Sequence, residues 1–476
     1  MNFDYNDLTV AKVNLDYIKD NINLIKSYYH NQKFLLPVKA NGYGHGAYEV
    51  SKVAEECGVD YLGVANIVEA EYLIKSGITA GIMILGLSPY QHIPAIVKYG
   101  VTATAASFPF LEKLSDEAQR RGKIAKVHIK VDTGMGRIGV AADDAVSLIE
   151  QGAHLSNIEI EGVFTHLSSA DMNDELSREY TLRQFNVFIG LLNKLEKTGF
   201  LPELRHISNS AGIVNFYKQT KNPLFNMIRP GIIVYGYPCD PYFKNDAGTR
   251  LAHGIKIPLS LYTHITGTRH LPAGSFISYG RTYKLPSQTH TAVLSIGYAD
   301  GFNRWLSNKG EVLVNGSKCR VLGRICMDQT VVDIDDISDV KIGQEVTVIG
   351  SSNGNSITCR DIAKKVGTIT YEILTMLSKR VKRIYIKGGE IMSYDIKKRA
   401  QVAAEMILED EGFADEFLAL GDEAGEKLYR KCENEAAALA KETAALDDEK
   451  ASEYLGRKIY DLKKKYREII QNEKAK

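Results

Sequence analysis

The sequence has few cysteines, the residues that form the disulfides of small proteins and many structural metal sites. Its six cysteines are scattered through 476 residues, with no CxxC pair and no tight Cys/His group. This scatter argues against a structural zinc site and against a disulfide framework. It is typical of proteins that fold in a reducing cytosol.

Long apolar runs are missing as well. The first residues, MNFDYNDLTVAKVNLDY, lack the uninterrupted apolar core of a signal peptide, and no stretch approaches the length of a transmembrane helix. The net charge is +1, and no basic stretch with interleaved aromatics appears. We therefore expect a cytoplasmic globular protein with no membrane or nucleic-acid partner, long enough for two or three domains.

Short β-rich runs alternate with helical ones from about residue 30 to 237. Eight such strands, each followed by a crossover, predict an α/β fold of the (β/α)8 TIM-barrel type rather than an open doubly wound sheet. Amphipathic helices are expected at 49–57, 69–75, 109–121 and 180–195. The expected strands are 34–39, 61–65, 81–85, 102–106, 125–131, 158–165, 204–207 and 228–235.

Two further regions follow the barrel domain, which spans 1–251. Residues 252–388 carry successive short strands at 264–268, 291–295, 311–314, 331–333 and 345–349, and helical patterns only at 359–366 and 371–377. This pattern predicts a mainly β C-terminal domain, which the first ten or so residues of the chain are candidates to join.

The tail, 389–476, is rich in Ala, Glu and Lys, lacks proline, and is predicted to be helical. It carries a heptad-like stripe of apolar residues. Two interpretations of the stripe remain open: helices that pack on the body of the protein, and a helix that binds a partner. The stripe comprises Leu455, Ile459, Leu462, Tyr466 and Ile469.

Lys39 ends an apolar run and is followed at once by a glycine-rich segment, ANGYGHG. A strand would deliver its ammonium into a crowded loop. Burial lowers the pKa of a lysine, and a neutral amine can form a Schiff base. A lysine that merely reaches solvent from a strand end is the alternative for this residue taken alone.

Polar or glycine-rich segments follow several of the predicted strands, at the point where each strand ends. Barrel active sites form at the carboxyl ends of the strands, so this clustering predicts one catalytic face. The residues concerned are Lys39, Arg137, His166, Asn209, Ser210, Arg229 and Gly231.

Nine short motifs occur in order along the chain: VKANGYGHG, KVDTGMGRIG, FTHLSSAD, HISNSAG, MIRPGIIVYG, SYGRTY, IGYADGFNR, GRICMDQ and TYEIL. This set resembles the bacterial alanine racemases, which are pyridoxal-phosphate enzymes built from a barrel and a β domain. The resemblance covers residues 1 to about 388 and leaves the tail outside.

The resemblance implies a covalent link between Lys39 and pyridoxal 5'-phosphate, and implies no metal. A dianionic phosphate in a dry site needs several fixed donors, and a glycine lets the backbone approach it. The donors implied are the phenols of Tyr43 and Tyr371, the hydroxyl of Ser210, and the backbone N–H groups of Gly231 and Ile232.

By the same resemblance, Arg229 faces the pyridine nitrogen and keeps it unprotonated, because an arginine does not give up its proton. Racemisation needs one base on each face of the α-carbon, and these would be Lys39 and Tyr279. His166, linked to Arg229, would support a phenolate at Tyr279.

Tyr279 lies in the β domain. In the family, the tyrosine at this position reaches the active site from the partner subunit, so an obligatory homodimer is expected. Met327 would offer its backbone N–H to the substrate carboxylate, with Asp328 beside it. Arg137 would contact the cofactor's phenolic oxygen or the substrate carboxylate. Lys130 matches a position that is carbamylated in many relatives, and the carbamate would hold Arg137.

Alanine is the expected substrate, because Tyr43 and Tyr371 narrow the pocket in relatives. Slow serine turnover is also expected, since pockets reject an added hydroxyl poorly. The D-alanine formed would supply cell-wall peptidoglycan.

Three rival interpretations remain open. An ornithine- or diaminopimelate-type decarboxylase shares the cofactor and barrel, but it places a glutamate opposite the pyridine nitrogen and uses a cysteine motif in place of SYG. A non-catalytic pyridoxal-phosphate carrier would resemble the barrel alone. The tail could make the enzyme a scaffold as well.

Overall fold

The structure is a computed structural model that describes residues 8–241 and 246–392 and, in the C-terminal tail, 428, 431, 435, 458 and 461–472. The chain divides into two compact units, Met1–Ile391 and Met392–Lys476.

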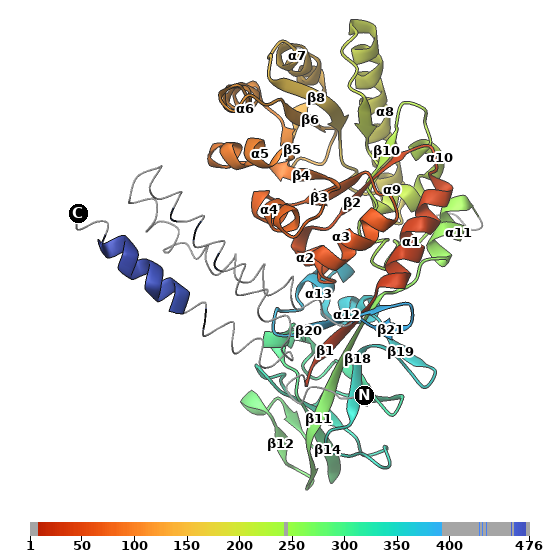
Figure 1. Ribbon diagram of the computed structural model, residues 1–476. Coiled ribbons are helices and arrows are strands. Elements are labelled where there is room, and N and C mark those ends of the chain that lie inside the picture. Colours follow the sequence, from red (N-terminus) through yellow and green to blue (C-terminus); the bar gives the residue numbers. More distant parts are fainter. Residues whose placement is uncertain are drawn as a thin grey trace. The chain divides into compact units, whose positions relative to one another are not determined.

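Eight parallel strands form the barrel of the first unit (Figure 1), in the order β10-β2-β3-β4-β5-β6-β8-β9. Backbone hydrogen bonds from Arg229 N–H to Ser208 O and from Asn226 N–H to Arg205 O, both 3.1 Å, link the two end strands. The predicted TIM barrel is therefore confirmed. Its strands are β2 (Lys33–Pro37), β3 (Tyr61–Val64), β4 (Gly81–Leu87), β5 (Thr102–Ala105), β6 (Ala125–Asp132), β8 (Ile158–Phe164), β9 (Leu204–His206) and β10 (Met227–Ile228), with β7 (Val140–Ala141) beside β6.

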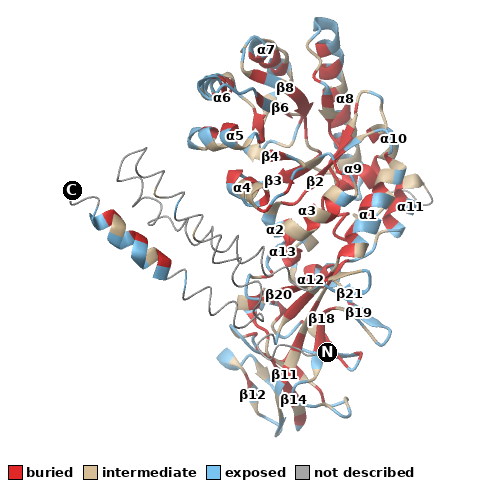
Figure 2. Cartoon of the chain, in the orientation of Figure 1, coloured by how far each residue is buried: buried red, intermediate tan, exposed pale blue. Residues whose placement is uncertain are grey.

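Part of the interior of the barrel is filled by apolar side chains that different strands contribute. Figure 2 shows buried positions along the strands and on the helix faces turned toward them. Burying such a side chain stabilises the fold by about 1.5–3 kcal/mol. One buried cluster contains Leu35, Met83, Phe164, Leu204 and Met227.

The last predicted strand, 228–235, is wrong in its length. β10 stops at Ile228, and residues 232–236 form turns in which Val234 N–H donates to Gly231 O at 2.9 Å. Pro230 explains the early end, because it has no N–H to continue the ladder. The apolar run is buried all the same, which is why it resembles a strand in sequence.

Helices follow the strands, and all four predicted helices occur with slightly shifted ends. The longest described helix, α8, is capped at its start by Asp174, whose side chain accepts a hydrogen bond from Ser177 N–H (2.9 Å), and at its end by Gly199, which has φ 78°. The helices are α1 (Leu15–Tyr28), α3 (Ala47–Glu56), α4 (Ile67–Lys75), η1 (Tyr90–His92), α5 (Ile93–Tyr99), α6 (Phe108–Arg120), α7 (Ala142–Ala153), α8 (Glu175–Thr198), α9 (Ser210–Asn215), α10 (Tyr217–Thr220) and α11 (Ala247–His253).

The second half of this unit is built on a ten-stranded sheet with the order β16-β15-β18-β11-β1-β20-β21, in which β14 joins β11 to β17 and β19 pairs with β18. All five predicted strands are present. The strands are β1 (Val10–Asn14), β11 (Leu259–Leu271), β14 (Thr289–Leu294), β15 (Glu311–Val314), β16 (Ser317–Arg320), β17 (Thr330–Asp333), β18 (Glu345–Ser352), β19 (Asn355–Ile357), β20 (Lys382–Lys387) and β21 (Glu390–Ile391), with a separate pair β12 (Phe276–Ile277) and β13 (Tyr283–Lys284).

The strand β1 precedes the barrel in sequence yet lies in this second sheet, antiparallel to β11 and parallel to β20. Barrel and sheet therefore share a crossing point at the start of α1 and belong to one compact unit. The predicted domain boundaries at 251 and 388 stay predictions.

Two helices close the β region, α12 (Cys359–Val366) and α13 (Thr370–Thr375). α12 begins with a capping box, in which Asp361 accepts from Thr358 N–H at 2.8 Å and Thr358 Oγ1 accepts from Asp361 N–H at 3.2 Å. The 3-10 turns η2 (Tyr279–Arg281), η3 (Tyr298–Asp300) and η4 (Arg304–Leu306) connect the strands.

The described part of the tail is helical. Leu462 and Tyr466 are buried as the predicted stripe requires, but Ile470 is more buried than Ile469. The shift follows from 3.6 residues per turn, which moves a heptad stripe round the helix. Tyr466 donates to Glu435 at 3.1 Å, and Leu455 and Ile459 lie outside the described residues.

No helix in the described parts of the chain combines the length and the hydropathy needed to cross a membrane.

Candidate active site

Lys39 opens a single left-handed turn, α2 (Lys39–Tyr43). The φ angles of Ala40, Asn41 and Gly42 are 52°, 55° and 60°. This conformation costs a residue with a side chain about 1–2 kcal/mol, and such strain concentrates at functional sites. The prediction that Lys39 belongs to the strand is wrong by two residues, because β2 ends at Pro37.

The left-handed turn packs tightly against α13. Gly44 has φ 83°, and a Cβ added there would lie 2.2 Å from the Leu374 carbonyl oxygen. This close approach places the ring of Tyr371 5.9 Å from that of Tyr43, between centroids. Tyr43 also stacks on Tyr235 at 4.7 Å. Three phenols therefore share one end of the site.

A small polar cradle lies beside these phenols. Ser210 Oγ accepts hydrogen bonds from Gly231 N–H (2.9 Å) and Ile233 N–H (3.3 Å). A Cβ at Gly231 would lie 2.9 Å from the Tyr43 hydroxyl, so only a glycine leaves this space open. The N–H of Ile232 has no hydrogen-bond partner among the described residues.

Asn209 fixes the start of α9 under this cradle. Its side-chain oxygen accepts from Gly212 N–H at 2.9 Å, and its amide nitrogen donates to Leu167 O at 3.2 Å. Asn209 thus anchors Ser210 rather than facing the cradle itself.

His166 lies among four cationic side chains. Burial lowers its pKa well below the ordinary value, which keeps the imidazole neutral. Four cations lower the pKa further, and their order of effect is Arg229, Arg137, Lys130 and Lys39. Such a concentration of positive charge favours an anionic ligand.

Lys39 itself is half-buried, and burial lowers the pKa of its amine. Arg137 lowers the pKa further, whereas Glu69 raises it. A larger neutral fraction of the amine makes Lys39 a better nucleophile and base.

Arg229 is buried, and its described partners are all neutral. Nη1 donates to His206 Nδ1 at 2.7 Å, and Nη2 donates to Thr165 O at 2.6 Å. Weaker bonds of Nη2 reach His166 Nδ1 (3.3 Å) and Ile207 O (3.2 Å). Burial lowers the pKa of Arg229 to about 9, and its Nε–H donates to none of the described residues.

Two buried histidines continue from Arg229 through the barrel. His206 Nε2 lies 2.8 Å from His128 Nδ1, and His128 Nε2 lies 3.2 Å from Glu161 Oε2. Glu161 also accepts from Tyr61 (2.7 Å) and Lys126 (2.8 Å). The guanidinium is thus connected to a carboxylate through two imidazoles.

Lys130 lies under the loop that carries Arg137. Its Nζ donates to Val131 O (2.7 Å) and Ile138 O (3.4 Å), at a side chain only 2% exposed. Burial first, and then Arg229, lowers its pKa to about 8. Arg137 is exposed, and no described residue forms an ion pair with it.

Tyr279 and Met327 form a separate, exposed group on the β region, with side chains 71% and 53% exposed. Their neighbours Ser278 and Cys326 touch, at 3.3 Å between Oγ and Sγ. No hydrogen bond or ring contact between described residues joins Tyr279 to Lys39 or to His166. The two predicted bases therefore do not meet through any contact within one chain.

The backbone around Met327 is held from one side. Ala299 N–H donates to Met327 O at 3.0 Å, while the Met327 N–H has no partner among the described residues. Asp328 is held by Arg380 (2.9 Å), which also binds Asp300 (3.0 Å). A free N–H is thus presented by a fixed loop.

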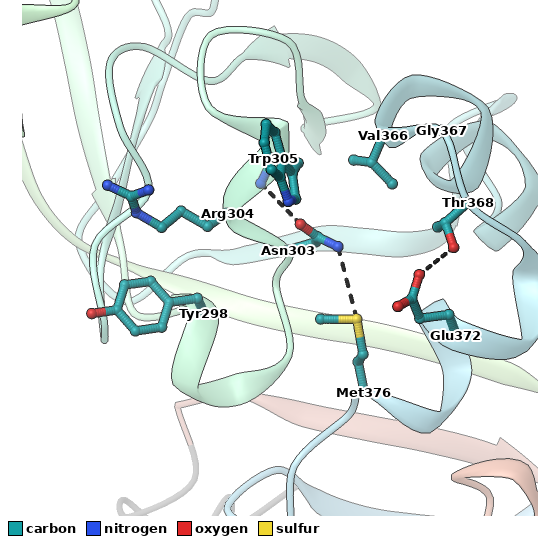
Figure 3. A pocket seen from close by; sticks show the side chains of 9 residues that line it. All are labelled: Tyr298, Asn303, Arg304, Trp305, Val366, Gly367, Thr368, Glu372 and Met376. Carbon is teal, nitrogen blue, oxygen red and sulfur yellow. Dashed lines mark hydrogen bonds between the residues drawn. The ribbon is translucent and has the colours of Figure 1, made fainter.

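A cavity of about 490 Å³ lies elsewhere on the β region (Figure 3). Trp305 and Asn303 form one side, and Thr368 and Glu372 the other. None of the predicted site residues lines it. The lining residues are Tyr298, Asn303, Arg304, Trp305, Val366, Gly367, Thr368, Glu372 and Met376.

Two family models match this chain in succession. The alanine racemase N-terminal domain matches residues 13–238, and the alanine racemase C-terminal domain matches residues 258–385. Alanine racemase 1 of Clostridium acetobutylicum is 40% identical over 384 residues, which cover 80% of this chain and 96% of the relative.

The chain belongs to the alanine racemase family.

Other members agree with this assignment. Alanine racemase 2 of Caldanaerobacter subterraneus subsp. tengcongensis is 41% identical over 396 residues, covering 83% of this chain and 98% of the relative. The solved alanine racemase of Clostridium difficile 630 superposes with a TM-score of 0.74 at 36% identity, covering 81% of this chain and 97% of that one. The structure from Bacillus anthracis with bound L-Ala-P gives 0.73 at 33% identity, covering 82% and 98%.

The family assignment applies to the first compact unit. Residues 386–476 lie outside both family models, as expected from the motifs. The predicted site residues in the barrel, together with Tyr371, lie in one region, whereas Tyr279, Met327 and Asp328 lie in the second group.

Several residues of the site were missed in the sequence. His128, His206 and Glu161 carry the connection from Arg229, Tyr235 supports Tyr43, and Glu69 binds the backbone beside Lys39. A signal for the histidines exists: each falls within a predicted barrel strand, where burial of an imidazole is costly unless it is hydrogen-bonded. Glu69 has no such signal, because a glutamate in the first turn of a helix is ordinary.

Proposed function

We propose that this chain interconverts L-alanine and D-alanine with pyridoxal 5'-phosphate. The observation that carries the proposal is Lys39, a half-buried amine of lowered pKa that follows a barrel strand and faces the cationic cluster around His166. The family assignment supports the same reaction. D-Alanine made in this way is a precursor of peptidoglycan.

The residues present fit this cofactor at its phosphate end. Gly231 leaves open the space that a Cβ would fill beside Tyr43, and the N–H of Ile232 is available as a donor. Ser210, Tyr43 and Tyr371 add hydroxyls at the same end. Gly231 N–H now donates to Ser210, and a phosphate oxygen would share or replace that bond.

The residues also fit at the ring end. When bound, pyridoxal phosphate withdraws electrons from an attached amino acid and so makes its α-hydrogen acidic. Arg229 has the free Nε–H described above and cannot accept a proton, so it would hold the ring nitrogen as an unprotonated acceptor. A decarboxylase of the same barrel type would place a glutamate there.

Lys39 and Tyr279 are the two bases in this proposal, acting on opposite faces of the α-carbon. Since Tyr279 is exposed and makes no described contact with Lys39, we assign it to the site of a second copy of the chain. Met327 N–H would then bind the substrate carboxylate from the same copy, and Asp328 would hold that loop through Arg380. The active unit is a homodimer.

Tyr43 and Tyr371 would select alanine by narrowing the space for the side chain. Their rings lie 5.9 Å apart between centroids, and both phenols are held neutral because burial raises their pKa. Serine, with one extra hydroxyl, is expected to react slowly.

Lys130 is proposed to carry a carbamate, formed when its neutral amine adds to carbon dioxide and releases a proton. The pKa of about 8 supplies a neutral fraction at physiological pH. The resulting anion would replace a buried cation beside Arg229 and would hold Arg137. An intact mass unchanged by bicarbonate would remove this part of the proposal.

The direct test is purification of the full chain in pyridoxal phosphate, followed by chiral analysis of L-alanine, L-serine and L-lysine. We expect fast formation of D-alanine, slow formation of D-serine and no D-lysine. The Lys39→Ala variant is the control, and it should lose both turnover and the visible absorbance of the bound cofactor. Carbon dioxide release without racemisation would favour the decarboxylase.

A further inference from the structure

The carboxylate of Glu69 binds the two backbone segments that meet at Lys39. Its Oε1 accepts a hydrogen bond from Ala40 N–H at 2.8 Å, one residue after Lys39. Its Oε2 accepts from Ala65 N–H at 2.7 Å, directly after β3. One side chain therefore ties the left-handed turn to the end of the neighbouring barrel strand.

Glu69 is itself held by the start of α4. Asn66 is the N-cap of this helix, and its side-chain oxygen accepts from Glu69 N–H at 3.1 Å. The carboxylate thus projects from a capped helical turn with few alternative positions. A charged acceptor also makes the bonds to Ala40 and Ala65 stronger than neutral ones would be.

The far side of the left-handed turn is held differently. Asn41 Oδ1 accepts from Ala47 N–H at 3.0 Å, and Asn41 O accepts from Gly46 N–H at 2.9 Å. These bonds fix the exit of the turn toward α3. The entry, where Lys39 lies, is fixed by Glu69.

Glu69 also acts on Lys39 through its charge. It raises the pKa of the Lys39 amine, against the lowering by burial and by Arg137. The same carboxylate therefore fixes the backbone next to Lys39 and changes the pKa of its amine.

We propose that Glu69 is a positioning residue for Lys39: its carboxylate holds the entry of the left-handed turn and thereby fixes where the Lys39 amine points. This role of Glu69 rests on the proposed function, because that function makes Lys39 a base and the residue that holds the cofactor. Misplacement of such a group by about 1 Å lowers turnover by roughly a hundredfold in other enzymes.

The test uses the full chain with Glu69→Gln and Glu69→Asp. Glutamine keeps the shape but loses the charge and can accept from only one of the two N–H groups. Aspartate keeps the charge but is too short to reach both. Glu71→Gln is the matched control, because Glu71 lies on the same helix and binds Tyr99 (2.5 Å) and Lys75 (3.0 Å) instead.

Two measurements are made on each variant. The first is the pH midpoint for acetylation of Lys39 by acetic anhydride in cofactor-free protein, measured by peptide mass spectrometry. The second is kcat and KM with L-alanine. We expect Glu69→Gln to lower the midpoint and to reduce kcat roughly ten- to a hundredfold with little change in KM. Glu69→Asp should reduce kcat while keeping the midpoint, and Glu71→Gln should change neither.

A Glu69→Gln protein that matches Glu71→Gln in both measurements would overturn the proposal. If Glu69→Gln does not fold, hydrogen exchange at the Ala40 amide of the unaltered chain decides: slow exchange supports the clamp, and exchange as fast as in an exposed peptide overturns it. A wild-type chain that is inactive on alanine would refute the proposed function alone, because the acetylation midpoints still test Glu69.

Discussion

Arg229 Nη1 and His206 Nδ1 lie 2.7 Å apart, and this single bond sets the direction of a buried chain of donors. An arginine only donates, so His206 accepts at Nδ1 and carries its proton on Nε2. It then donates to His128 Nδ1, and His128 donates from Nε2 to Glu161. Burial lowers the pKa of both histidines, which keeps them neutral. A continuous chain of hydrogen bonds therefore runs from the Arg229 guanidinium to the Glu161 carboxylate.

Glu161→Gln should change the response of the protein to acid. Burial raises the pKa of Glu161, but hydrogen bonds from His128, Lys126 and Tyr61 outweigh this and lower it to about 2. A lowered acid pKa stabilises the fold fully above the unfolded value of about 4.3, and this stability is lost as pH falls toward 2. After discount for solvent screening we expect about 1–2 kcal/mol.

The measurement is urea unfolding of wild type and Glu161→Gln at pH 7 and at pH 3. The difference between the two proteins should be larger at pH 7. An equal difference at both pH values would show that the carboxylate charge contributes nothing.

Tyr279→Phe should separate the two faces of the reaction. The variant keeps the ring but loses the proton acceptor, so it should bind the cofactor normally and fail on one enantiomer by at least about a hundredfold. Racemisation rates alone do not reveal this, because equilibrium couples both directions. Exchange of the α-hydrogen with solvent deuterium, measured for L-alanine and D-alanine separately, is the informative readout. Equal loss for both enantiomers would contradict a face-specific base.

Gly44→Ala should destabilise the protein more than Gly100→Ala. Both glycines have positive φ, 83° and 66°, so both variants carry the left-handed penalty of about 1 kcal/mol. Only at Gly44 does the new Cβ meet a backbone atom, the Leu374 oxygen, whereas nothing lies within 4 Å at Gly100. We expect an additional cost of about 1–3 kcal/mol in urea unfolding. Similar costs for both variants would mean that α13 moves aside freely.

Removal of residues 392–476 should leave racemisation intact. The family models end at residue 385, and the first compact unit ends at Ile391. Activity per mole and the proteins that co-purify are both measured, with the full chain as the control. Lost activity would give the tail a catalytic role, and lost partners with retained activity would make it a binding module.

The barrel was predictable because its signals are redundant. Eight apolar runs at crossover spacing remain recognisable even when single ends are wrong, as at Lys39 and at Ile228. The error at Ile228 arose because a buried segment of turns and a buried strand have the same apolar composition. Pro230 ends the strand because it has no N–H to continue the ladder, and composition alone does not show this. The left-handed turn at Ala40 could not be predicted from the sequence, because an alanine does not indicate a positive φ angle.

The candidate site could be predicted from the sequence only where short motifs carry its residues. The residues proposed to bind the cofactor, such as Arg229 and Ser210, lie in glycine-rich motifs at strand ends. Residues that act through others, such as Glu161 and Glu69, lie inside regular strands or helices, and their partners are distant in sequence. Glu161, for example, meets His128 across 33 positions. Such pairs follow from register and not from local pattern.

The place of β1 has a consequence for how the protein is made. Val10 pairs with Tyr262 on one side and with Lys382 on the other, so the first strand to leave the ribosome waits for one of the last. At about 5–20 residues per second, translation alone delays that pairing by roughly 20–70 s. Nascent chains stalled before Tyr262, which contain neither partner strand of β1, should therefore be cut by protease near Val10, while their barrels already resist.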